Sequence, residues 1–331
     1  MCDVHDDIHD GRSPLVSIGV PAFNAEAFIV PAVESLLAQD LTDLEVVVSD
    51  NGSTDATGRL VREIAARDSR VRYVRQPVNR GGAANFDAVF ALRHPGARYF
   101  KWAAADDVHE PGYLSAVLGL LESDPSVSVA HSATDDIDED GHRLRVWDDQ
   151  GLQADHPDVA VRFASLSQRN HECFSIFGLM RTETLAATRG LGRYPESDRV
   201  LLAELALHGR LVDVPRVLFH RRQHPGRSVR EYPTARDRVA WFNPELVGRP
   251  VFPEWRLGRG YVDAVLTAPL SARDRARCLA TMAHWTVARA PHLARNVART
   301  AVDLSRGRVA LRSTAHPHVP DSAPVSTSPW A

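Results

Sequence analysis

The sequence predicts an α/β protein with a mostly parallel, Rossmann-like sheet flanked by helices, followed by a helical C-terminal extension. Three observations support this prediction. Short apolar runs alternate with amphipathic segments over the first hundred residues, which is typical of parallel strands with covering helices. Acidic and amide residues directly follow these runs. Beyond residue 270 the chain is arginine-rich, with apolar residues at helical spacing.

The first half contains four predicted strands separated by three predicted helices. Each strand is a short apolar run bounded by turn residues, and each helix shows apolar residues at helical spacing. Thr54 is the expected N-cap of the second helix, and Arg80-Gly81-Gly82 opens the third. The strands are expected at 16–20, 44–50, 71–74 and within 97–107, and the helices at 28–39, from Thr54 to about 65, and from 80 to 90.

After Asp107 the pattern is less regular. Pro111 and Gly112 begin a predicted helix, Asp140-Gly141 predicts a hairpin turn, and Gly209 ends a predicted amphipathic helix. Residues 151–196 show no clear pattern. Further strands are expected at 127–133, 143–147, 211–214 and 217–222, and helices at 112–123, 198–209 and 271–312 with a break at Pro291.

Length and composition exclude several classes of protein. The 331 residues are 44% hydrophobic and 24% charged, unlike a disordered chain. A formal net charge of -3 gives no basic excess, so we expect no nucleic-acid partner. No apolar run reaches the ~18 residues needed to cross a bilayer. Three separated cysteines favour a reducing cytoplasm over a disulfide framework or zinc site. Residues 1–14 and 313–331 are expected to be flexible tails.

Four polar segments lie where a parallel sheet binds ligands, beyond the carboxyl ends of its strands. The segments are 21–24, 50–55, 79–82 and 105–107. No GxGxxG follows the first strand and no GxxxxGK[ST] occurs, which disfavours a classical dinucleotide fold and a P-loop enzyme. We therefore expect a different kind of ligand cleft at this edge of the sheet.

At these positions the chain resembles the family 2 glycosyltransferases, which have the GT-A fold. The resemblance rests on four motifs in order: PAFNAEAFI, VVVSDNGSTDAT, NRGGAANFDAVF and KWAAADD. It covers roughly residues 15–230 and implies a nucleotide-sugar-binding catalytic domain there, with 231–312 as a helical extension. The implied activity is inverting, metal-dependent sugar transfer (EC 2.4 type) to a hydroxyl of a cell-surface glycan or a natural product.

Asp106 and Asp107 are the expected metal site. A sugar-nucleotide diphosphate is negatively charged, and a divalent cation held by carboxylates neutralises it. The resemblance implies Mg²⁺ or Mn²⁺ on Asp107, with Asp106 contacting the donor ribose or the metal shell. Ala105 replaces a third acid that the family often has. The alternative is a pair of solvated loop acids.

His224 lies in a segment that resembles the closing motif of the family. Some members use a histidine there to complete the metal shell, which neutral imidazole can do. A polar loop histidine is the alternative. Arg222 and Arg227 can instead hold the diphosphate.

The resemblance assigns Asp50 to the donor base, because a carboxylate can accept an imide or amide N–H. A turn residue before Asn51-Gly52 is the alternative. Arg80 is expected near phosphate, and Glu26 is a weaker donor-site candidate. Phe23 either stacks on the base or belongs to the core. The nucleotide pocket would be formed by Pro21, Ala22, Phe23, Asn24 and Asn79.

Inversion requires a base that takes the acceptor proton. The family carries an acidic pair at the start of a helix at this point. Here Ser197 replaces the first acid, so Asp198 is the expected base and Glu196 the second candidate. Ser197 is also a good N-cap, and an acid in the first turn favours the helix dipole in any case.

The acceptor site is expected near Trp147, His171 and Glu172, with Arg169, Phe174 and Phe177. Aromatic faces suit sugar rings, although these residues can equally belong to the core. Residues 136–141 copy the first half of a calcium-binding loop, but the twelfth position is Trp147 instead of glutamate, so a charged hairpin tip is favoured.

The stretch from Ser271 to Arg312 contains nine arginines. It can pack on the catalytic domain with a solvated arginine face, form a homodimer, or lie on the anionic inner face of a membrane as a peripheral contact. Two other functions stay open. A sugar-phosphate nucleotidyltransferase would need a GxGTR loop that is missing here, and a non-catalytic nucleotide-sugar-binding protein is compatible with Ala105 and Ser197.

Overall fold

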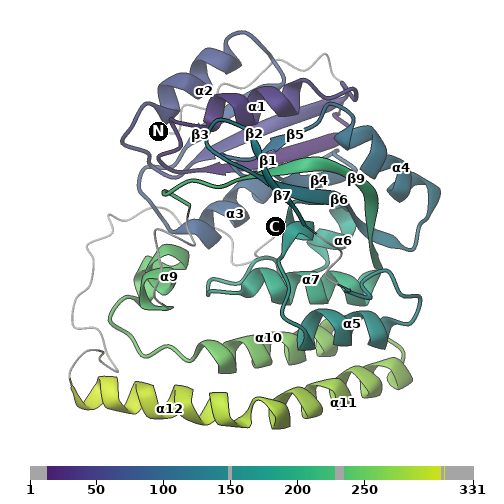
Figure 1. Cartoon of the computed structure of the whole chain (residues 1–331), viewed down its shortest axis with the longest axis vertical. Coiled ribbons are helices and arrows are strands. Elements are labelled where there is room, and N and C mark those ends of the chain that lie inside the picture. The colour runs from purple at the N-terminus through teal and green to yellow at the C-terminus, as the bar shows by residue number, and fades with distance from the viewer. Residues whose placement is uncertain (1–12, 148–150, 228–234, 307–308, 310–331) are drawn as a thin grey trace.

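The computed structural model describes residues 13–147, 151–227, 235–306 and 309. Its centre is a mixed sheet of nine described strands in the order β3-β2-β1-β4-β8-β6-β9-β5, with β7 paired to β6 (Figure 1). The predicted tails lie outside the described residues, apart from 13 and 14. The strands are β1 Val16–Ala22, β2 Leu44–Asp50, β3 Val71–Arg75, β4 Tyr99–Trp102, β5 Val108–His109, β6 Val127–Ile137, β7 Arg143–Val146, β8 Leu179–Arg181 and β9 Arg210–Arg222.

The first four strands form the predicted parallel sheet. Strand β1 lies between β2 and β4, and β3 pairs with the outer edge of β2, all in parallel. The register places Ala22 opposite Asp50, so the carboxyl ends of β1 and β2 meet. Both strands are buried over almost their whole length, which is why they read as continuous apolar runs.

The second half of the sheet is mixed. Strand β8 pairs antiparallel with β4 and β6, whereas β6 and β9 are parallel. The two strands expected at 211–214 and 217–222 form one strand, β9. Its register shifts between Val214 and Val217, so Pro215 lies in a bulge, where its missing N–H is tolerated.

Helices cover both faces of the sheet (Figure 1). One hydrophobic core lies under α1, α2 and α4, and a second lies between the sheet and α3, α5 and α7. The helices of this part are α1 Ile29–Leu37, α2 Thr57–Ala65, α3 Gly82–Ala91, α4 Tyr113–Ser123, α5 Val159–Gln168, α6 Thr182–Ala186 and α7 Ser197–His208, with a 3₁₀ turn, η1, at Phe174–Phe177.

Several helix boundaries differ from the prediction. Thr54 is not an N-cap: α2 begins after Ala56, whose N–H donates to Glu26 Oε2 at 2.8 Å. Ser197 is the first residue of α7, so it is not the N-cap either. Helix α5 was not predicted, because four of its buried positions are arginine, serine or alanine, which give no apolar stripe.

The C-terminal extension packs on the part of the chain that forms the sheet and shares its second core. It contains α9 Ala235–Phe242, η2 Pro244–Leu246, α10 Pro253–Thr267, α11 Ala272–Ala288 and α12 Ala290–Ser305. Helix α10 lies against α7, and α11 lies against α5 (Figure 1). Tyr261, Met282 and Trp285 are buried. The break between α11 and α12 is at Arg289, and Pro291 occupies the first turn of α12. Among the described residues, no helix is long and apolar enough to span a membrane.

Gly81, in the 79–82 loop, packs closely against the C-terminal extension. Its φ of +89° is left-handed, and a Cβ there would lie 2.7 Å from Phe242 O and Pro244 Cδ. Gly141 has a similar φ of +90° with no atom within 4 Å of the added Cβ. We expect Gly81→Ala to lower the free energy of unfolding by about 2–4 kcal/mol, and Gly141→Ala by only about 1 kcal/mol. Urea denaturation of both variants measures this difference, and equal losses would contradict the contact.

Candidate active site

Side-chain hydrogen bonds join the loops that follow β1 and β2. Asn24 Oδ1 accepts from Thr54 N at 2.9 Å, and Asn24 N donates to Ser53 Oγ at 2.9 Å. Asn24 has a left-handed φ of 47°, which asparagine tolerates. Together with the bond between Glu26 and α2, these contacts give the predicted donor residues Asn24 and Glu26 a role in holding the edge of the sheet together.

Two buried asparagines, neither of them a predicted site residue, extend this network. Asn51 Nδ2 donates to Asn79 Oδ1 at 2.9 Å, and Asn51 Oδ1 accepts from Arg80 N at 3.0 Å. Asn85 of α3 accepts from Ser49 Oγ at 2.6 Å. In the sequence, a polar asparagine on the apolar side of the predicted helix is the feature that could have identified Asn85. The side chain of Arg80 is exposed at this rim.

Asp50 is fully buried and carries hydrogen bonds on both carboxylate oxygens. Oδ1 accepts from Ser53 N at 2.7 Å. This is the contact expected if Asp50 is a turn residue, the alternative to a role at the donor base. Oδ2 accepts from the hydroxyl of Tyr73 and from Arg75 Nη1 at 2.9 Å. Burial, and then the bond to Asp50, raise the pKa of Tyr73. These donors orient the carboxylate, and its contact with a donor base stays a prediction.

Asp106 and His224 come from segments far apart in the sequence and are in contact, and Asp107 follows Asp106 in the chain. The antiparallel pairing of β5 with β9 places residues 106–107 beside 221–224. His224 Nε2 lies 2.9 Å from Asp106 Oδ2, and Asp107 Oδ1 accepts from Arg222 N at 2.8 Å. Asp107 is 3% exposed. Burial, and then the charge of Asp106, raise the pKa of Asp107 to about 8.

Arg222 joins this group to the hairpin between β6 and β7. Its Nε donates to Asp106 O at 3.0 Å, and its Nη1 donates to the carbonyls of Asp138 and Glu139 at 3.0 and 2.7 Å. The side chain is 5% exposed. Arg222 therefore supports the Asp106–Asp107 loop, in contrast to the expectation that it can hold a diphosphate.

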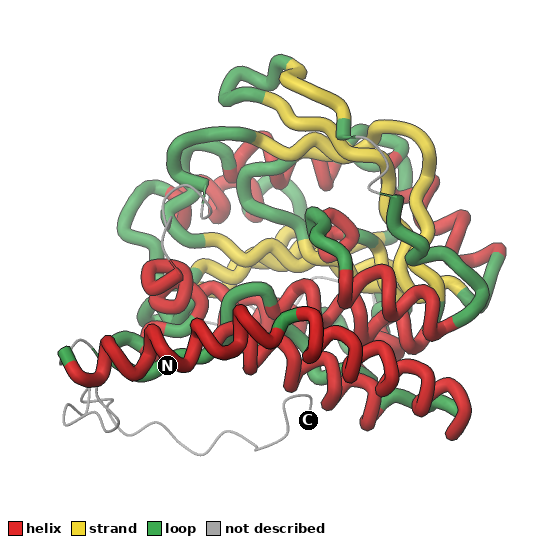
Figure 2. The backbone as a smooth tube through the Cα atoms, turned by 60° about the horizontal axis from the view of Figure 1, so that its bottom comes forward, coloured by secondary structure: helices red, strands yellow, loops and turns green. Residues whose placement is uncertain are grey.

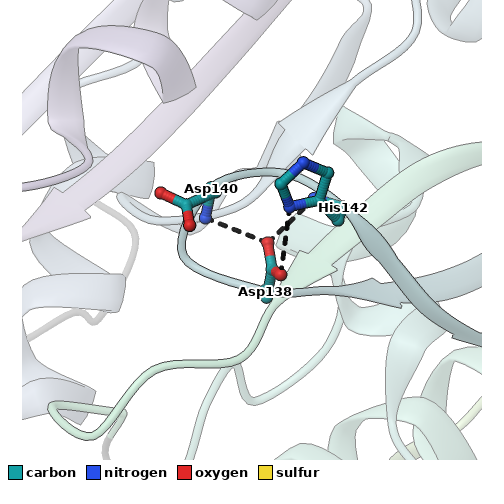
Figure 3. Close-up of side chains that lie close together, drawn as sticks. All are labelled: Asp138, Asp140 and His142. Atoms are coloured by element: carbon teal, nitrogen blue, oxygen red, sulfur yellow. Dashed lines mark hydrogen bonds and ion pairs between the residues drawn. The ribbon is translucent and has the colours of Figure 1, made fainter.

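The hairpin carries a second acidic group, of the form Asp-x-Asp. Asp138, Asp140 and His142 have possible ligand atoms within 4.8 Å of one another (Figure 3). Asp138 Oδ1 accepts from Asp140 N at 3.0 Å and from His142 N at 2.8 Å. These are the bonds of a tight turn, and the three residues are half-exposed or exposed. They agree with the predicted charged hairpin tip.

Asp198 lies in the first turn of α7. Its Oδ1 accepts from Arg199 N at 2.9 Å. Burial raises the pKa of Asp198 above 3.8, although Arg199 and the nearby Cys173 and His171 oppose the rise. The preceding Glu196 is exposed, with a left-handed φ of 66°. Ser197 Oγ is buried without a hydrogen-bond partner in the part of the chain described.

Arg199 attaches the predicted acceptor segment to α7. Its Nη1 donates to Asn170 Oδ1 at 3.0 Å and to His171 O at 3.3 Å. The ring nitrogens of His171 lie 3.0 and 3.1 Å from the carbonyls of Glu172 and Leu166, and burial lowers its pKa. His171 thus occupies a hydrogen-bonded interior position, the alternative that the sequence left open.

Trp147 and Glu172, the other acceptor candidates, meet around Arg221. Its Nη1 donates to Glu172 Oε2 and its Nε to Asp136 Oδ1, both at 2.8 Å. The guanidinium lies 4.8 Å from the ring centroid of Trp147, and Arg145 lies 3.5 Å from the same ring. Burial opposes ionisation of Asp136, but the bonds led by Arg221 lower its pKa to about 2. Neighbouring residues of a strand face opposite ways, so Arg221 and Arg222 serve different groups.

Two grooves lie away from these residues. One, of about 520 Å³, runs between α5 and α11. The other, of about 420 Å³, lies between α10 and α12 beside Trp255. Neither is lined by Asp50, Asp106 or Asp107. The geometry of the candidate site therefore rests on side-chain contacts at the sheet edge.

Residues 17–184, about half of the chain, match the family model described as Glycosyl transferase family 2. The chain belongs to this family. The match runs from β1 to α6 and includes the four motifs, which confirms the resemblance. Asp198 and His224 lie beyond it, and the roles of all the predicted site residues stay predictions.

Two of the curated relatives of this family 2 chain are much longer proteins. Chondroitin synthase of Escherichia coli is 38% identical over 133 residues, which are 40% of this chain and 19% of the relative. Hyaluronan synthase of Pasteurella multocida is 31% identical over 136 residues, 41% of this chain and 14% of the relative. The chain thus spans a fifth or less of their length.

Solved structures show the same fold at low sequence identity. S. aureus TarS 1-349 in complex with UDP-GlcNAc has a TM-score of 0.58 and 17% identity, and the match covers 82% of this chain and 72% of TarS 1-349. This likeness confirms the GT-A fold class predicted for the family 2 chain, including the helices that follow the sheet.

Proposed function

We propose that this chain is an inverting glycosyltransferase that moves a sugar from a nucleoside diphosphate donor to an acceptor hydroxyl. Family membership supports the reaction class, and the relatives named chondroitin and hyaluronan synthases and the TarS complex with UDP-GlcNAc support a nucleotide-sugar donor. The observation that carries the proposal is the contact of Asp106 with His224, beside Asp107, at the sheet edge. Residues 15–230 form the catalytic domain, and 231–312 form its extension.

The ligand types of this group suit a divalent cation, although among the described residues only Asp138, Asp140 and His142 bring three possible ligand atoms within 4.8 Å of one another. Carboxylate oxygens are the preferred ligands of Mg²⁺, and imidazole suits several transition metals. Asp106 Oδ2 and His224 Nε2 lie 2.9 Å from each other. The hydrogen bond from Arg222 N fixes the orientation of the Asp107 carboxylate. Asp107, Asp106 and His224 would hold Mg²⁺ or Mn²⁺, which when bound neutralises the charge of the leaving diphosphate.

The loops after β1 and β3 would receive the nucleotide. Phe23 is 39% exposed at the end of β1, where its ring can stack on a base. Arg80 would approach the phosphates, and Asp50, held by Tyr73 and Arg75, would orient the base edge. Pro21, Ala22 and Asn79 would complete the wall.

Asp198 would take the proton from the acceptor hydroxyl. A general base works best when its pKa approaches the working pH, and burial moves Asp198 in that direction. Glu196 is the competing candidate. The acceptor, a glycan or natural product, would contact Trp147 and Glu172, which Arg221 holds together, and His171 would support their segment.

Donor binding tests the proposal directly. A ligand at a hundred times its Kd stabilises the folded state by about 2.7 kcal/mol, or roughly 4 °C in melting temperature for a chain of this size. We expect one of the UDP, GDP or TDP sugars to produce such a rise only with Mn²⁺ present. Donor binding without transfer or hydrolysis would favour the non-catalytic alternative, and pyrophosphate release from a nucleoside triphosphate and a sugar phosphate would favour a nucleotidyltransferase.

The pH dependence of transfer follows from Asp198. The base must be ionised, and its pKa in the folded protein is raised above 3.8. Transfer should therefore fall as the pH drops through this raised value, so the acidic limb of kcat has its midpoint above the ordinary range of aspartate. Measurement of kcat from acidic to neutral pH at saturating donor checks this, and Glu196→Gln should leave the midpoint unchanged. A midpoint at or below 3.8 would argue against Asp198.

A further inference from the structure

Helices α11 and α12 each turn one exposed stripe away from the protein. On α11 the buried residues Cys278, Met282 and Trp285 face the core, and Val287, two residues beyond Trp285, points the opposite way. On α12 the buried residues are Leu293 and Thr300. We call the opposite, exposed side of the two helices the outer face, and define it by Arg273, Val287, Arg295, Arg299, Val302 and Arg306.

The outer face is both cationic and apolar. Its four arginines are exposed, and Val287 and Val302 are 74% and 44% exposed. The two acids of these helices lie off this face. Asp274 is hydrogen-bonded to Ser271 at the start of α11, and Asp303 is half-buried and has an interaction partner. The two helices follow one another along one side of the molecule (Figure 2), so the stripe is long.

We propose that the outer face docks the protein on an anionic lipid bilayer. Arginines on such a face bind acidic headgroups, and small apolar side chains between them enter the headgroup boundary. The buried side of α11 and α12 is already taken up by α5 and α10, so these helices lie on the membrane without leaving the catalytic part. This inference does not rest on the proposed sugar transfer.

A second copy of the chain fits this face less well. A symmetric dimer brings the same patch of both chains together, which would oppose four arginines with four arginines. Like charges across an interface are unfavourable. A lipid surface supplies the complementary negative charge instead. The exposed valines favour lipid over a purely ionic partner, because a soluble polyanion offers them no apolar contact.

Sedimentation of the full chain with lipid vesicles tests the proposal. We expect binding to phosphatidylcholine vesicles that contain phosphatidylglycerol, weaker binding at high salt, and none to pure phosphatidylcholine. Each arginine near an anionic surface raises the affinity for that surface about fivefold. The triple variant Arg295→Gln, Arg299→Gln, Arg306→Gln should therefore bind roughly a hundredfold more weakly, and Val287→Asp should also bind more weakly.

A matched control separates the outer face from net charge. The control also loses three positive charges at exposed sites, through Arg59→Gln, Arg67→Gln and Arg98→Gln. Helix α2, which carries Arg59, lies on the opposite side of the molecule from α12 (Figure 1). This control should bind vesicles like the parent. Absence of binding to anionic vesicles, an equal loss in the control, or a dimer that the outer-face variant dissociates while vesicle binding is unchanged would overturn the proposal.

Discussion

Asp107→Asn is expected to lower kcat/KM for sugar transfer by about a thousandfold. The substitution removes one negative ligand from the proposed cation site, and a bound cation contributes several kcal/mol of charge stabilisation at the leaving diphosphate. Asparagine keeps an oxygen that can accept from Arg222 N, the bond that Asp107 makes at 2.8 Å. The fold should therefore survive, which a melting curve checks. Transfer kinetics at several Mn²⁺ concentrations give the loss itself.

Asp140→Ala is the matched control, because it tests the other acidic group. The carboxylate of Asp140 belongs to the hairpin group with Asp138 and His142, and its residue takes part in the turn through its backbone N–H. We expect its kcat/KM to stay within about twofold of the parent. Near-normal transfer by Asp107→Asn together with a large loss in Asp140→Ala would place the cation at the hairpin and contradict the proposed site.

Asp198→Asn should lower kcat by about a thousandfold, within the usual range for the loss of a general base. Asparagine has nearly the same volume and still accepts from Arg199 N, but it cannot take a proton. Donor binding should change little, because the proposed donor site lies in other loops. Single-turnover kinetics and calorimetric titration of the donor separate these two effects.

Glu196→Gln is the comparison for the competing base. Glu196 is exposed and precedes α7 in a left-handed conformation, so its neutral analogue should retain kcat within a few-fold. A large loss in Glu196→Gln combined with nearly full activity in Asp198→Asn would exchange the two roles. Full activity in both variants would show that neither Asp198 nor Glu196 is the catalytic base.

Local patterns were sufficient to predict the parallel half of the fold. Strand β2 has the predicted bounds, Leu44–Asp50, because a strand buried on both faces reads as an apolar run ended by a turn. The same patterns failed for α5, whose buried side includes Arg162, Ser165 and Ser167. Arg162 is accommodated by donation to the carbonyls of Ala206, His156 and Pro157, a tertiary solution that no local pattern reveals.

The candidate site divides in the same way. Acids at strand ends predicted where Asp50, Asp106 and Asp107 would be found along the sheet. The arginines that organise these groups were missed or misread, because their partners are remote: Arg221 bonds to Asp136 and Glu172, and Arg222 bonds to the 106–107 loop. Only the pairing of β9 with β5 and β6 brings these residues together.

A crystal structure of the protein soaked with Mn²⁺ and UDP, with anomalous data collected at the manganese edge, tests the central claim most directly. We predict a manganese peak bound by Asp107, with Asp106 and His224 in its shell and the diphosphate as a further ligand. A peak between Asp138, Asp140 and His142, or UDP bound with no peak near Asp107, would contradict the account.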